Sequence, residues 1–143
     1  MSLNISAFEN SNWAIDYEDI PENDTIAGHG PFIINFTVGR FGGVWIPVKF
    51  NKKTYTVSEI LRVTYNTYHK LITQKEIDIL AETGLGRDMC RYAELQQKIR
   101  NDEKYYRIYI QGDKRFFEGF HEGYSSQKRT IDGIKQYYNH LGS

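Results

Sequence analysis

The feature that most constrains the fold is a change of hydrophobic period between residues 44 and 72. Apolar side chains first occupy every second position: Val44, Ile46, Val48 and Phe50. They then recur at spacings of four, three and four: Leu61, Tyr65, Tyr68 and Ile72. The first pattern predicts a strand and the second one face of a helix of about four turns. Pro47 cannot donate a ladder hydrogen bond, so this strand is expected at a sheet edge or at an irregularity.

Two capping boxes predict where helices begin. Residues 56–59 read Thr-Val-Ser-Glu and residues 73–76 read Thr-Gln-Lys-Glu. In each, the Thr hydroxyl can cap the start of a helix, while the Glu three residues later reaches back to the Thr backbone N–H. The second helix is expected to turn Ile77, Leu80 and Ala81 inward and to end at Gly84 and Gly86. A third helix is predicted over residues 87–100.

Three further strands and a last helix complete the predicted elements. Residues 32–38 are apolar and β-rich, and residues 104–111 and 115–120 are predicted to form a hairpin around Gly112 and Asp113. Residues 130–141 are predicted to form a short amphipathic helix. This order predicts an α+β fold: a small antiparallel sheet with three or four helices packed mainly on one face.

Charge is distributed unevenly along the 143 residues. The chain holds 18 Lys and Arg and 18 Asp and Glu, so its formal net charge is zero. Residues 1–30 carry six carboxylates and no Lys or Arg, which leaves residues 31–143 with 18 − 12 = +6. We therefore divide the chain into an acidic N-terminal arm, residues 1–30, and a single α+β domain, residues 31–143. Such an arm can fold back on the domain, bind a partner or only solubilise it.

Length and composition exclude several classes of protein. The length fits one domain with a sizeable core. No run approaches the ~18 apolar residues of a membrane span, and the first residues lack the pattern of a secretory signal. A lone cysteine, Cys90, cannot form an intramolecular disulfide. An intracellular, non-secreted protein is expected.

No motif indicates a reaction. The glycine clusters lack the spacing of phosphate-binding loops, and the histidines lack metal-ligand spacing. Cys90 has no recognisable base beside it in the sequence. We therefore expect no catalytic residue, cofactor or metal, and no small-molecule substrate is evident. An enzyme with a site built from scattered residues remains a third alternative.

The predicted hairpin at residues 104–117 is basic and aromatic. Its cations and exposed rings would be contributed by five residues: Tyr105, Arg107, Tyr109, Lys114 and Arg115. Rings on one face of a hairpin can stack on bases while cations meet phosphates. A nucleic-acid-binding module is therefore an alternative function, against the simpler interpretation that the tyrosines cover the core.

The capping-box region also resembles a known family. The residues that carry the resemblance are the Thr-Val-Ser-Glu-Ile-Leu run at 56–61, Tyr65, Tyr68, the Ile-Thr pair at 72–73, Glu76 and the Phe-Glu-Gly element at 117–119. Over residues 44–120 they resemble a domain of unknown function that is widespread in fungal proteins and has relatives in giant DNA viruses. The resemblance implies a strand, helices and a strand pair, and no catalytic residue.

These observations favour a non-enzymatic protein-interaction or structural module. The richness in Ile, Asn, Lys and Tyr is compatible with an AT-rich viral genome. We therefore expect a virion or virus-factory protein, located in the host cytoplasm or in the virion. The interaction is expected with a protein partner or with copies of the same chain. Exposed aromatic residues anchor interfaces, so the predicted interaction residues are Trp13, Tyr17 and Trp45.

Overall fold

A computed structural model describes residues 2–39, 44–83, 97–98, 100–101, 104–111, 114–124 and 127–142. The fold is α+β and contains mixed sheets. Its elements in chain order are β1 (Ser2–Leu3), η1 (Ile5–Phe8), β2 (Ile26–His29), β3 (Phe32–Val38), β4 (Val44–Phe50), β5 (Tyr55–Thr56), α1 (Val57–Tyr68), α2 (Gln74–Thr83), α4 (Arg107–Ile110), β6 (Phe116–His121), β7 (Thr130–Ile131) and β8 (Ile134–Gly142).

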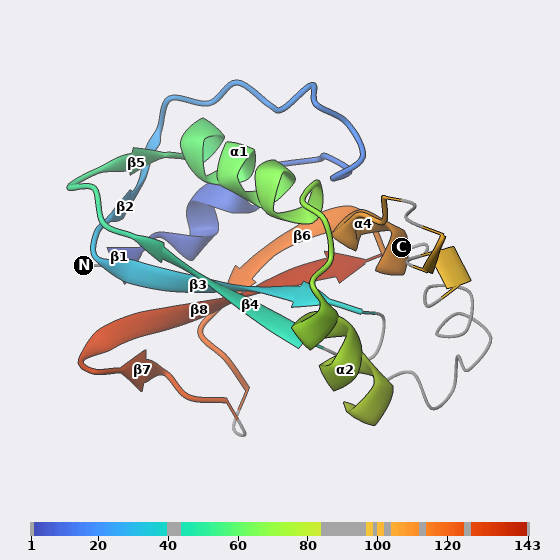
Figure 1. Cartoon of the computed structure of the whole chain (residues 1–143). Helices are drawn as coiled ribbons and strands as arrows, with labels where there is room; N and C mark the ends of the chain where they lie inside the picture. Colours follow the sequence, from blue (N-terminus) through green and yellow to red (C-terminus); the bar gives the residue numbers. More distant parts are fainter. Residues whose placement is uncertain are drawn as a thin grey trace.

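The main sheet has the strand order β4-β3-β8-β6, and β7 extends it as a hairpin with β8 (Figure 1). β3 pairs antiparallel with β4 along its whole length, which confirms both predicted strands and places Pro47 on an edge strand. β3 pairs parallel with β8, so the prediction of a purely antiparallel sheet was wrong. A second, three-stranded sheet has the order β1-β2-β5.

The two capping boxes form as predicted. The Thr56 hydroxyl accepts from the backbone N–H of Glu59 at 3.2 Å, and the Glu59 carboxylate accepts from the Thr56 N–H at 3.1 Å. Thr73 and Glu76 make the same reciprocal pair at the start of α2, at 3.2 Å in both directions. Each box satisfies N–H groups that a helix start leaves unpaired. The predicted third helix, residues 87–100, lies almost entirely outside the described residues.

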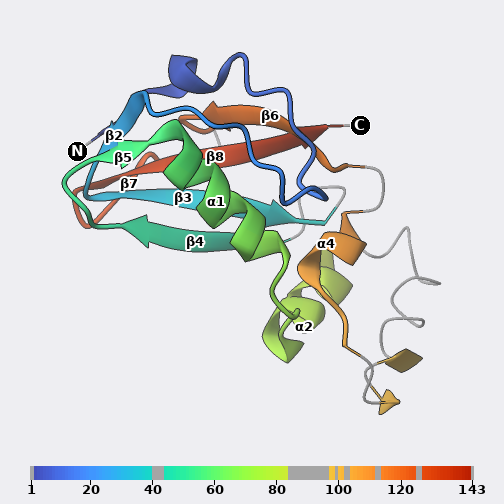
Figure 2. The same cartoon turned by 90° about the horizontal axis from the view of Figure 1, so that it is seen from above.

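The core lies between α1 and the main sheet (Figures 1 and 2). Phe36 of β3 meets Tyr68 of α1 there, with ring centroids 6.1 Å apart. The segment 2–30 contributes Leu3, Phe8, Trp13 and Ile15 to the same core. α2 and α4 lie beyond one end of the sheet rather than over its face (Figure 2). The prediction that the helices gather on one face therefore holds for α1 alone among these three.

The segment 130–141 forms β7 and β8 instead of the predicted helix. β8 runs through the middle of the sheet and is buried on both faces: Gln136, Tyr137, Tyr138 and Asn139 are all at most 6% exposed. Polar residues on a doubly buried strand hide the alternation that would have shown its period. The turn before β8 has left-handed backbone at Asp132 (φ 51°) and Gly133 (φ 76°), the geometry of a two-residue hairpin.

The predicted hairpin strand at 104–111 is also absent. Residues 107–110 form the short helix α4. The backbone at the start of this helix is hydrogen-bonded to the linker between α1 and α2. The backbone N–H of Arg107 donates to the Lys70 carbonyl at 3.0 Å, and that of Ile72 donates to the Tyr105 carbonyl at 2.9 Å. β6, the predicted return strand, pairs with β8 instead.

Candidate functional site

The face of the main sheet opposite α1 is the candidate site. α1 and the N-terminal run lie on one side of the sheet, whereas the β6–β7 connection and the β7–β8 hairpin lie on the other (Figure 1). Alternation along β4 directs Trp45 to this second side, and the register places Tyr138 of β8 there as well. We call this surface the open face.

The open face is hollowed in two places. A hollow of about 640 Å³ lies between β4 and the β6–β7 connection, and it is lined by Asn35, Trp45, Tyr124, Gln127, Lys128, Ile131, Gln136 and Tyr138. A smaller hollow of about 180 Å³ lies toward the ends of β3 and β8, and it is lined by Thr37, Gly39, Trp45, Gln111, Lys114, His121, Tyr124, Asn139, His140 and Leu141. Both are lined by Trp45 and Tyr124, so we treat them as one groove.

An aromatic cluster forms the centre of the groove. Trp45 meets Tyr138 edge to face with ring centroids 5.3 Å apart, and His121 stacks on the other side of Tyr138 at 5.8 Å. Tyr124 lies 4.5 Å from His121 and is 62% exposed. The Tyr138 hydroxyl donates to the Lys128 carbonyl at 2.6 Å, which fixes the ring at the centre of the cluster. Three strands and a loop thus present rings with apolar faces to an occupant.

The floor of the groove is a buried amide pair. Asn35 Nδ2 donates to Gln136 Oε1 at 2.9 Å, and Gln136 Nε2 donates to the Lys128 carbonyl at 3.3 Å. Both side chains are at most 6% exposed. Asn139 follows Tyr138 on β8 and turns its side chain to the α1 side of the sheet, where its Nδ2 donates to the Tyr68 hydroxyl at 2.9 Å.

The charges that line the groove have one sign. Lys114 and Lys128 are lining residues, together with His121 and His140, whereas neither hollow has a carboxylate among its described lining residues. Burial, together with nearby His140, lowers the pKa of His121, so its ring is neutral at pH 7. Its Nδ1 accepts from the Gly123 N–H at 3.0 Å. The groove is therefore mildly cationic at neutral pH and becomes more so on acidification.

The three predicted interaction residues lie in different surroundings. Trp13 is 4% exposed, and its Nε1 donates to the Tyr17 carbonyl at 2.9 Å, so it is a core residue rather than an accessible anchor. Tyr17 is 65% exposed on the α1 side of the molecule. Trp45 lines the groove. The structure therefore places Tyr17 and Trp45 on opposite sides of the sheet.

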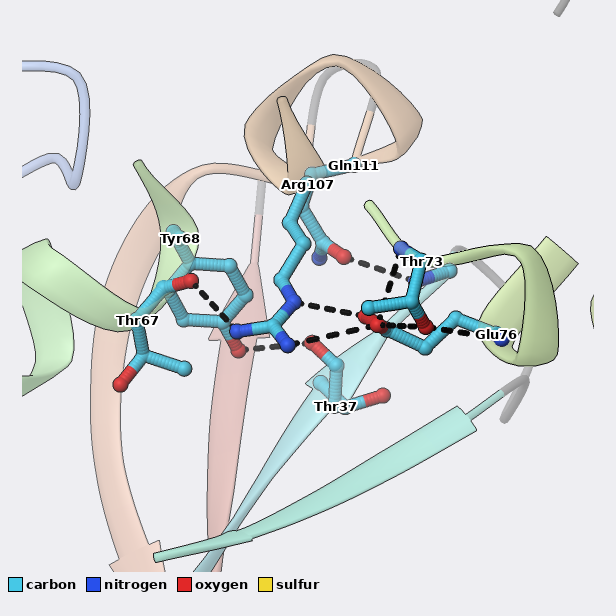
Figure 3. A network of polar contacts seen from close by, with 8 residues as sticks. Thr37, Thr67, Tyr68, Thr73, Glu76, Arg107 and Gln111 are labelled. Atoms are coloured by element: carbon cyan, nitrogen blue, oxygen red, sulfur yellow. Dashed lines mark hydrogen bonds and ion pairs between the residues drawn. The ribbon is translucent and has the colours of Figure 1, made fainter. Parts of the chain in front are cut away.

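The residues predicted for nucleic acid do not share a surface as the hairpin would require. Arg107 is held inside the molecule by the Glu76 carboxylate, with Nε to Oε1 at 2.6 Å, and it donates to the Thr67 carbonyl at 3.0 Å (Figure 3). Burial opposes ionisation of Glu76, but hydrogen bonds from Arg107 and Thr73 outweigh it and hold the pKa of this carboxyl below its usual value. Arg107 thus ties α4 to the end of α1 and the start of α2.

The other predicted nucleic-acid residues scatter. Arg115 donates to Asp16 at 2.8 Å and, with Tyr109, lines a separate hollow of about 420 Å³. A carboxylate in that hollow opposes phosphate binding. Tyr105 packs against Tyr109, with ring centroids 5.3 Å apart, and Lys114 lines the groove on the open face instead.

Tyr124, Lys128 and Tyr138 are not among the site residues that the sequence predicts. Tyr138 falls in the segment 130–141, for which the sequence predicts a helix, so the sequence does not bring these residues together. One signal was available: the Asp-Gly pair at residues 132–133 is a strong two-residue hairpin signal, and it predicts two paired strands here.

Comparisons with known proteins identify no relative of this chain. Searches against protein-family models, curated proteins and solved structures gave no match for this chain. Among the described residues, no group of three or more His, Cys, Asp or Glu side chains is placed to hold a metal ion. No helix in the described part of the chain is long and apolar enough to cross a membrane.

Proposed function

We propose that the protein is a non-enzymatic protein-interaction module that holds an extended, acidic segment of a partner in the groove of the open face. The observation that carries the proposal is the pairing of an aromatic cluster with lysines. Trp45 and Tyr124 offer apolar ring faces, and aromatic residues of this kind anchor interfaces. Lys128 is exposed at the rim of the same hollow and favours a carboxylate-bearing occupant.

A protein segment accounts for the groove better than a nucleic acid does. Sites for nucleic acid are usually much more positively charged than sites for proteins. Here two lysines line the groove among the residues that the structure describes, and the chain as a whole has no net charge.

Fluorescence anisotropy tests this proposal with three labelled polymers. The probes are a random copolymer of Glu and Tyr, a random copolymer of Lys and Tyr, and an oligo-dT strand. We expect the Glu–Tyr copolymer to bind most tightly. Binding of the oligo-dT strand without binding of the acidic copolymer would assign the groove to a nucleic acid and overturn the proposal.

Two matched pairs of variants locate the binding site. We expect Trp45→Ala to weaken copolymer binding at least tenfold and Tyr109→Ala, an exposed aromatic outside the groove, to leave it unchanged. Lys128→Gln is expected to weaken binding several-fold at low salt, against no change for Lys75→Gln on α2. Equal affinities across each pair would show that the polymer binds elsewhere.

A further inference from the structure

A second surface on this chain has the chemistry that the groove is expected to bind. Residues 16–24 run along the α1 side of the molecule without helix or strand, and they contain no Lys or Arg. Their exposed side chains are Asp16, Tyr17, Glu18, Asp19, Glu22 and Asp24. We call this segment the acidic ridge. It combines carboxylates with one aromatic ring that is 65% exposed.

The acidic ridge is held in shape by its backbone. The Trp13 indole donates to the Tyr17 carbonyl, and the Ser58 hydroxyl donates to the Pro21 carbonyl at 2.9 Å. The backbone N–H of Asn23 donates to the Ser58 hydroxyl at 2.6 Å, and that of Ser58 donates to the Asn23 carbonyl at 3.1 Å. Because these bonds use the main chain, the acidic side chains stay outside. A surface ordered in advance loses less entropy on binding.

Few intramolecular contacts compete for the ridge carboxylates. Asp16 pairs with Arg115, and Glu18 lies 3.8 Å from Arg62 in an exposed pair of little strength. Asp19, Glu22 and Asp24 make no ion pair with the described residues. These three carboxylates can therefore meet cations of another molecule.

We propose that the groove on the open face of one copy takes the acidic ridge of a second copy, with Tyr17 of the ridge packing against the Trp45–Tyr124 part of the groove. This inference rests on the proposed function and names its partner. The groove has lysines and no carboxylate among its described lining residues, whereas the ridge has carboxylates and no cation, so the two surfaces are complementary in charge.

The placement of the two surfaces determines the kind of assembly. The ridge follows the α1 side of the main sheet (Figure 1). The groove is lined by Trp45 and Tyr138, which the strand register directs to the opposite side, so a single copy cannot fill its own groove. A contact between two different surfaces of identical molecules is heterologous, and it leads to a ring or to an open chain of copies. Each copy in the middle of such a chain would use both surfaces.

Mixing two variants tests this inference. The groove variant is Trp45→Ala. The ridge variant combines Tyr17→Ala, Asp19→Asn and Glu22→Gln. Sedimentation velocity and native mass spectrometry measure the mass of each full-length chain over a range of concentrations. We expect the mass of the wild-type chain to rise with concentration and to fall with added salt, and each variant alone to stay monomeric.

The mixture is the decisive sample. Because each variant keeps one intact surface, an equimolar mixture should form a one-to-one dimer and no larger species. A control variant with Asp78→Asn and Glu82→Gln, two exposed carboxylates of α2, should assemble like the wild type. Assembly of the ridge variant alone to wild-type masses would overturn the inference, as would a mixture that stays monomeric.

The outcome also separates this inference from the proposed function. A wild-type chain that stays monomeric but still binds the Glu–Tyr copolymer through Trp45 would overturn self-assembly and leave the module with a different acidic partner. Failure of both self-assembly and copolymer binding would overturn the two proposals together.

Discussion

The indole of Trp45 and the phenol ring of Tyr138 meet edge to face, with centroids 5.3 Å apart, although 93 residues separate them in the sequence. They come from strands on either side of β3. The Tyr138 ring is fixed by its own hydrogen bond to Lys128, so the cluster has a rigid member beneath a more accessible one. This arrangement lets Trp45 report directly on what enters the groove.

The two tryptophans should therefore differ in fluorescence. In a Trp45→Phe chain, the remaining Trp13 is buried and should emit at short wavelength with little quenching by iodide. In a Trp13→Phe chain, Trp45 should be quenched more strongly, and the Glu–Tyr copolymer should protect it. Iodide titrations of both variants, with and without copolymer, measure this difference. Equal quenching of the two would contradict the assignment of Trp13 to the core.

The Arg107–Glu76 pair is expected to be the most costly ion pair to break. Its side chains are 12% and 7% exposed, against 31% and 36% for Arg115 and Asp16. Removing one partner of a buried pair costs about 3–5 kcal/mol, because the other charge stays buried. Urea unfolding should show a loss of that size for Arg107→Met and at most ~1 kcal/mol for Arg115→Met. The double variant Arg107→Met with Glu76→Leu should lose less than Arg107→Met alone.

Glu76 should also make stability depend on pH. Its pKa is lower in the folded chain than in the unfolded chain, so its contribution is present above the unfolded value and is lost as pH falls through the folded value. The stability difference between the wild-type chain and Glu76→Gln should therefore shrink on acidification from pH 6 toward the folded pKa. Urea unfolding at several pH values measures it. A constant difference would show that the carboxylate is not stabilised by Arg107.

His121 predicts a change at a higher pH. Burial and His140 lower its pKa in the folded chain below the unfolded value, so the unfolded state binds the proton more readily. The wild-type chain should lose stability as pH falls through the unfolded value of about 6.5. A His121→Gln chain should lose less over the same interval. Thermal unfolding at pH 7.5 and pH 5.5 compares the two, with His29→Gln on the exposed end of β2 as the control.

The β7–β8 turn offers a test that involves backbone conformation alone. Gly133 has φ 76°, and a Cβ added there would meet no atom within 4 Å. Gly133→Ala should cost roughly 1–2 kcal/mol through left-handed strain. Gly133→Asn should cost clearly less, since Asn tolerates this conformation. Urea unfolding of the two variants measures the difference. Equal losses would contradict left-handed strain as the cause.

The sequence predicted the elements whose local signals agree with their tertiary surroundings. The strands at 32–38, 44–50 and 116–120 alternate or are strongly apolar, and both capping boxes are closed within four residues. Such features depend on neighbours in the chain, so the sequence alone can specify them. The α+β class follows from them.

The remaining elements depend on partners far away in the chain. Residues 107–110 have an alternating pattern, yet they form a helix whose first residue, Arg107, pairs with Glu76, 31 residues earlier. The middle of β8 is buried on both faces, so its polar residues do not alternate with apolar ones in the way that marks a half-exposed strand. The groove unites β3, β4, β8 and the β6–β7 connection, and no periodicity predicts which of these come together. Trp45 was identified because the alternation along β4 directs it away from the apolar face of the strand, and it is half-buried in the structure.

The hydroxyl of Tyr68 affects which elements unfold together. The register of β3 and β8 ends at Asn35 and Tyr138. Beyond it, the phenol of Tyr68 donates to the Thr37 carbonyl at 2.7 Å and accepts from the side-chain amide of Asn139 at 2.9 Å. A helix side chain thus bridges the main chain of β3 and a side chain of β8. Because separating α1 from the sheet breaks both bonds, we expect α1, β3 and β8 to unfold as one unit, with amide hydrogens that exchange with solvent together.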